Sequence, residues 1–127
     1  MNFVIAVHGA PMTSYAGEHA LGFAQAALSD GHQIERIFFL HDGIYHAVRT
    51  RSPGPDGLDL VPSWQHLADA GIELAVCIGS AGRRGLVAAA AESTPTTTPL
   101  AQGFQLAGLG QLIAGIQAAD RYLEFPA

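Results

Sequence analysis

The chain has 127 residues, 13% of them charged, and a formal net charge of −5, with six arginines and no lysine. This length favours a single domain, residues 1–127, and the acidic balance argues against direct nucleic-acid binding, which needs a basic face. The absence of lysine excludes both a P-loop lysine and a Schiff-base lysine.

The cysteine count and the apolar segments indicate the cellular compartment in which the protein is expected. Cys77 is the only cysteine, so no internal disulfide can form, and we expect a reducing compartment, the cytoplasm. Met1-Asn2 leads directly into an apolar run without a basic segment, so no signal peptide is expected. No apolar run reaches the roughly 18 residues of a membrane span.

The share of charged residues bears on partners. Because about 25% of the residues are charged in typical soluble domains, the low share in this chain predicts an apolar surface that is buried against a partner.

The first half of the chain reads as a β-α-β unit followed by a loop. A continuous apolar run predicts a strand at Phe3–Val7, helical spacing follows over Tyr15–Ser29, and a second strand is predicted at Gln33–Leu40. Such a unit joins parallel strands through a right-handed crossover. We expect a short helical stretch at Ile44–Val48, and the density of proline and glycine predicts a flexible loop at residues 49–57.

The second half continues the alternation of helices and strands. The remaining predicted elements are a helix at Leu58–Ala70, a strand at Ile72–Cys77, a helical run at Leu86–Ala91, a loop with two prolines at residues 92–99, a short strand at Gly103–Leu106, a helix at Leu109–Ala118 and a terminal strand at Asp120–Phe125. The pattern predicts one α/β domain of three layers, α/β/α, with a mostly parallel five-stranded sheet of flavodoxin-like architecture.

Cys77 is the first candidate site residue, because it ends a predicted strand and precedes a Gly/Ser/Ala turn at 79–82. Strand, turn and helix in this order put a side chain at the carboxyl edge of a parallel sheet, where reactive groups collect. The reactive form of a cysteine is the thiolate, which a helix N-terminus stabilises by about 0.3–1 kcal/mol. Arg83 or Arg84 could add to this if either folds back. Since a lone cysteine at a strand end is often an inert small hydrophobe, position alone leaves both interpretations open.

Two histidines are predicted to share that edge. His8 and His41 each follow a predicted strand, as Cys77 does, so a parallel sheet would bring all three to one polar cleft together with Asp42. One of them could act as an acid or base, and a hydrogen-bonded structural role is the alternative. His41 and His46 lie five residues apart without the Cys or carboxylate neighbours that zinc sites add, so no metal site is expected.

The glycines after the cysteine allow another interpretation. Gly79, Gly82 and Gly85 are evenly spaced, whereas the dinucleotide fingerprint has its first two glycines two residues apart. A phosphate-binding turn remains possible because helix N-termini attract anions. Trp64 is expected either in the core or as an anchor at an interface.

Three stretches in order resemble the DsrE/TusD family of sulfurtransferases, most closely its TusD-type subunits. They are Phe-Phe-Leu-His-Asp-Gly-Ile-Tyr at 38–45, Cys77 before Arg-Arg-Gly at 83–85, and Gln-Gly-Phe-Gln-Leu-Ala-Gly-Leu-Gly at 102–110. The resemblance extends from Phe3 to Phe125 and implies a DsrE-like fold over residues 1–127. It also implies that Cys77 accepts sulfur as a persulfide from a small donor protein and passes it to an acceptor protein, without a cofactor.

The resemblance further implies partners and a pathway. A TusD-type subunit works in a hetero-hexamer with two homologous subunits of the TusB and TusC type, and the relay ends in 2-thiouridine at the wobble position of tRNA. DsrE-type relatives serve dissimilatory sulfur oxidation instead. The alternative from another class is a non-catalytic flavodoxin-like module that binds a nucleotide or has only a structural role.

Overall fold

The apolar runs of the sequence form the strands of one parallel sheet. The computed structural model describes residues 1–86 and 98–127. Its five strands lie in the order β4-β3-β2-β1-β5, and each neighbouring pair is parallel. Their bounds are β1 (Asn2–Val7), β2 (Gln33–Phe39), β3 (Glu73–Cys77), β4 (Phe104–Ala107) and β5 (Arg121–Phe125). The expected five-stranded sheet is therefore confirmed, and it is wholly parallel.

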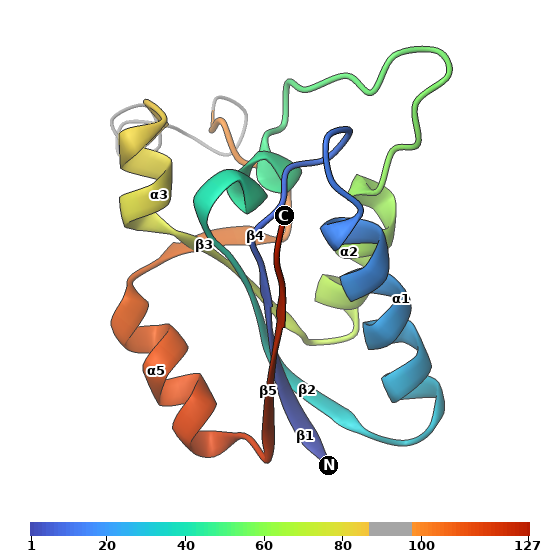
Figure 1. Cartoon of the computed structure of the whole chain (residues 1–127), viewed down its shortest axis with the longest axis vertical. Helices are drawn as coiled ribbons and strands as arrows, with labels where there is room; N and C mark the ends of the chain where they lie inside the picture. Colours follow the sequence, from blue (N-terminus) through green and yellow to red (C-terminus); the bar gives the residue numbers. More distant parts are fainter. Residues whose placement is uncertain (87–97) are drawn as a thin grey trace.

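Helices cover both faces of this sheet (Figure 1). α1 (Ala16–Ser29) and α2 (Val61–Asp69) pack on one face, and α5 (Leu109–Ala118) packs on the other. Side chains alternate across each strand, so Val76 belongs to the core under α1 and α2, while Ala75 and Cys77 face the α5 side. This is the three-layer α/β/α architecture that the sequence predicts. In the part of the chain described, no helix is long and apolar enough to cross a membrane.

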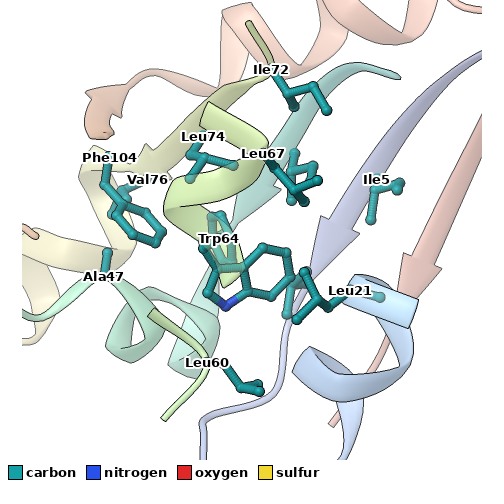
Figure 2. Packing of buried hydrophobic residues seen from close by; sticks show 14 of the residues in the cluster. Ile5, Leu21, Ala47, Leu60, Trp64, Leu67, Ile72, Leu74, Val76 and Phe104 are labelled. Atoms are coloured by element: carbon teal, nitrogen blue, oxygen red, sulfur yellow. The ribbon is translucent and has the colours of Figure 1, made fainter. Parts of the chain in front are cut away.

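Trp64 lies in the larger core and has no exposed surface. Its ring meets Phe39 edge-on, with centroids 5.1 Å apart. Figure 2 shows it among Leu60, Leu67 and Leu21, which come from the residue before α2, from α2 and from α1 in turn. Of the two roles predicted for Trp64, the structure thus assigns the core.

Two further segments lie at the carboxyl edge of the sheet. The 3₁₀ helix η1 (His41–Ala47) follows β2, and the short helix α3 (Ile78–Arg83) follows β3. The prediction for the first segment was wrong at its start, because the helix begins at His41 rather than Ile44. Gly43 allows this close turn, since a Cβ there would lie 2.1 Å from the Val7 carbonyl oxygen.

Other predicted boundaries also shift. α2 begins at Val61 rather than Leu58, because the Asp59 carboxylate accepts the Val61 N–H at 3.1 Å and holds a turn before the helix. Leu86 lies beyond the end of α3 and is not helical. The rest of the predicted helix, residues 87–91, and residues 92–97 of the second loop lie outside the described residues.

Candidate functional site

Cys77 is the last residue of β3 and caps the N-terminus of α3. Its Sγ accepts a hydrogen bond from the Ser80 N–H at 3.4 Å, which satisfies one of the first-turn N–H groups that have no partner within the helix. The helix therefore starts directly after the cysteine, and residues 79–82 lie inside it. The predicted turn between cysteine and helix was therefore wrong.

The thiol is almost enclosed. Cys77 is 4% exposed and packs in the cluster beneath α5, beside Ala107 of the neighbouring strand. Ile78, the next residue, is 45% exposed. The sulfur thus lies at the carboxyl edge of the sheet, next to an exposed residue.

Ser80 connects the cysteine to the neighbouring segment η1. Its side chain is buried, with 3% exposure, and its Oγ accepts the His41 N–H at 2.8 Å. Its carbonyl oxygen accepts a hydrogen bond from Arg84 Nη1 at 3.0 Å. Sequence reasoning missed this residue; the available signal was a lone hydroxyl in a run of glycine and alanine directly after Cys77.

The two arginines have different positions. The Arg84 guanidinium binds Asp42 of η1, with Nε and Nη2 at 2.9 and 2.8 Å from Oδ1, so it joins α3 to η1. A Cβ atom added to Gly79 would lie 3.5 Å from Arg83 Nη1 and 3.9 Å from Cys77 Sγ. Arg83 Nη1 and the sulfur of Cys77 therefore border the same space beside Gly79.

His8 and His41 come together at this edge. Their Nδ1 atoms are 2.9 Å apart, so one ring donates to the other. His41 has φ of +52°, in the left-handed region. Burial lowers the pKa of His8, the carboxylate of Glu124 opposes this from 3.8 Å, and His41 adds to the lowering. We call Cys77, Ser80, His41, Asp42 and Arg84 the cysteine cluster; His8 borders it through His41.

His46 does not belong to this cluster. It is fully buried, its Nε2–H donates to the Gly9 carbonyl at 3.0 Å, and its ring packs against Phe39 and Trp64. His41 and His46 therefore do not converge. Within residues 1–86 and 98–127, no three His, Cys, Asp or Glu side chains are arranged to hold a metal ion.

Comparison with known proteins identifies relatives that span the chain. Sulfurtransferase TusD of Cronobacter sakazakii is 40% identical, with 98% of this chain and 100% of the relative covered. Putative sulfurtransferase DsrE of Allochromatium vinosum is 35% identical, with 98% of each covered. The crystal structure of the ychN protein from E. coli has the same fold, with a TM-score of 0.81 at 24% identity over 98% of this chain and 99% of that one. Residues 1–125 match the model of the DsrE/DsrF-like family, and the chain belongs to this family.

Proposed function

We propose that the chain is a sulfur-relay sulfurtransferase, one domain over residues 1–127, that carries sulfur as a persulfide on Cys77. The observation that supports this most is the position of the single cysteine. It caps a helix at the carboxyl edge of the sheet, in a chain whose full-length relatives bear the name sulfurtransferase.

The reaction consists of two thiol exchanges. The Cys77 thiolate attacks the outer sulfur of a donor persulfide, a new S–S bond forms on Cys77, and the donor leaves as a thiolate. The thiolate of an acceptor protein then attacks that outer sulfur and releases the Cys77 thiolate. Electrons balance in each step, so the exchange requires no cofactor.

Neighbouring groups support the anionic sulfur. The Ser80 N–H already points at Sγ, and a hydrogen bond to an ionised acceptor is roughly twice as strong as a neutral one. The Arg83 guanidinium adds positive charge nearby. Arg84 acts indirectly, since its bonds to Asp42 and to the Ser80 carbonyl hold η1 against α3. His41 has a positioning role, because its backbone N–H donates to the Ser80 hydroxyl, and His8 supports His41 through the hydrogen bond between their rings.

An apolar surface beside the cysteine suits the partner subunits of the relay. Ile78, Leu109 and Ile113 are 45%, 53% and 56% exposed; Leu109 follows the strand that pairs with β3, and Ile113 lies one turn along α5. Exposed large apolar side chains in one region are typical of protein interfaces. We propose that this surface contacts homologous subunits of the TusB and TusC type in a hetero-hexamer.

We further propose that the relay is cytoplasmic and ends in 2-thiouridine at the tRNA wobble position. The identity to TusD over the whole chain supports this destination. Dissimilatory sulfur oxidation is the second candidate, because the chain is 35% identical to putative sulfurtransferase DsrE over nearly the same length.

Sulfur loading tests the chemistry. The protein is treated with a low-molecular-weight persulfide, and its intact mass is measured. We expect the addition of one sulfur atom, which reduction removes, and no addition to Cys77→Ser, a variant of nearly the same shape. A wild-type protein that gains no sulfur, or a serine variant that gains as much, would contradict the proposal. Measurement of 2-thiouridine in tRNA from a strain that lacks the gene decides between the two pathways.

A further inference from the structure

A cleft of about 360 Å³ lies at the carboxyl edge of the sheet, apart from the cysteine cluster. Its walls come from the loop between β1 and α1 and from the segment that leads into α2, which lie at the same end of the sheet (Figure 1). Its lining consists of residues 11–15, Glu18, residues 56–58 and Leu60, and we call it the acidic cleft. No residue of the cysteine cluster is among these.

Large apolar side chains stand exposed around this cleft. Met12, Tyr15 and Leu58 are 64%, 74% and 67% exposed, the three highest values among the large hydrophobic residues of the described chain. Met12 also has φ of +76°, a conformation that a non-glycine residue rarely adopts. Exposed apolar side chains around a concave surface are typical of binding sites.

The charge of the cleft selects the occupant. Glu18 and Asp56 are the ionisable side chains of its lining apart from the Tyr15 phenol, and among the residues that the structure describes no arginine, lysine or histidine lines it. The chain as a whole carries −5. Arginine and lysine side chains match this combination, because each has an apolar stem that packs on apolar surface and a cationic end. An arginine end can also stack on the exposed ring of Tyr15.

We propose that the acidic cleft docks an extended basic segment of a partner protein. One long cationic side chain packs its stem between Met12 and Leu58 and directs its charge to Glu18 and Asp56, and an apolar neighbour covers Tyr15. The site lies on the same edge of the sheet as Cys77 but uses no residue of the sulfur chemistry. It is therefore independent of the proposed function.

The test follows backbone amide resonances of the full chain by NMR during titration with two synthetic pentapeptides. The first is acetyl-Gly-Arg-Leu-Arg-Gly-amide, and the second has glutamate in place of both arginines. We expect saturable shifts at Met12, Tyr15, Gly57 and Leu58 with the basic peptide, weakened by added salt, and none with the acidic one.

Paired variants separate the cleft from the overall acidity of the protein. The double variant Glu18→Gln/Asp56→Asn should weaken binding roughly fivefold or more, the size expected for two exposed charge pairs, and Leu58→Ser should also weaken it. The control Asp30→Asn/Asp69→Asn removes the same charge at the ends of α1 and α2, on the opposite edge, and should leave affinity unchanged.

Three results would overturn the proposal. The first is an equal loss of affinity in the control variant, and the second is shifts spread over the whole surface. The third is the same four amides shifting with protein concentration alone, because the occupant would then be a second copy of the chain. Sulfur loading of Cys77 from a small persulfide should be unchanged in the cleft variants, so a failure of either proposal leaves the other testable.

Discussion

His46 should make the stability of the protein depend on pH between about 7 and 4. Burial lowers its pKa from 6.5 to about 4; the Gly9 hydrogen bond opposes this, and the charge of Arg51 adds to the lowering. In the unfolded chain the ring is solvated and takes up a proton near its ordinary value. As pH falls below 6.5, the unfolded state therefore binds a proton that the folded state does not, and the free energy of unfolding decreases.

The size of this effect follows from the two values. The difference between 6.5 and about 4, at about 1.36 kcal/mol per pH unit, corresponds to about 3 kcal/mol of stability lost at pH values below 4. About 2 kcal/mol of it should already be lost at pH 5, because the unfolded ring is then almost fully protonated and the folded ring is not. The loss bears on the site, since His46 lies in the last turn of the segment η1 that supplies His41 and Asp42.

Urea denaturation at pH 7, 6 and 5 measures this loss against a variant that cannot titrate. His46→Gln retains an N–H for the Gly9 carbonyl but has no ring to pack against Phe39 and Trp64. It should be less stable than wild type at pH 7, and the gap should narrow by about 2 kcal/mol at pH 5.

Two comparisons keep this interpretation testable. His66→Gln removes an exposed histidine of α2 and measures what an unburied ring contributes to the pH dependence. A difference between wild type and His46→Gln that stays constant from pH 7 to pH 5 would refute the reasoning, because the stability difference would then have no contribution from protonation.

Four further substitutions test the cysteine cluster and the residues beside it. Ser80→Ala removes the acceptor of the His41 N–H and should cost about 1–3 kcal/mol of unfolding free energy; an unchanged denaturation midpoint would contradict this. Arg83→Gln should slow sulfur loading about twofold to fivefold with little change in stability, as expected for one exposed charge, whereas Arg84→Gln should lower the melting temperature. Equal kinetic effects of the two arginine variants would argue against these separate roles. Gly43→Ala places a methyl group 2.1 Å from a β1 carbonyl oxygen and should destabilise by about 1–3 kcal/mol in the same denaturation assay, so a variant as stable as wild type would show that the turn can relax.

Local patterns were sufficient to predict most of the architecture. The predicted helix at Leu109–Ala118 has the bounds of α5, and the predicted strands match β1 to β5 within one or two residues. Apolar runs and helical spacing indicate which side chains are buried. The period with which buried side chains recur along a segment distinguishes a strand from a helix. The same rules predict the common edge of His8, His41 and Cys77, because each follows a parallel strand.

The errors lie where a single side-chain contact, rather than a pattern along the segment, decides the local structure. α3 starts directly at Ile78 because Sγ of Cys77 caps it, although two glycines in six residues argue for a turn. α2 starts late because Asp59 holds a turn before it. His46 has the polar character of a surface residue, yet it fills a space beside Gly17, where a Cβ would lie 2.2 Å from the imidazole.

The sequence by itself determined the alternation of strands and helices, the edge of the sheet at which Cys77 lies, and the low content of charged residues. Only the tertiary structure decided what surrounds the sulfur. Ser80 meets His41 across 39 positions of the chain, and Arg84 meets Asp42 across 42. Such contacts form because the parallel sheet brings the ends of β2 and β3 together, and the periodicity of a local segment carries no information about which distant side chain will face it.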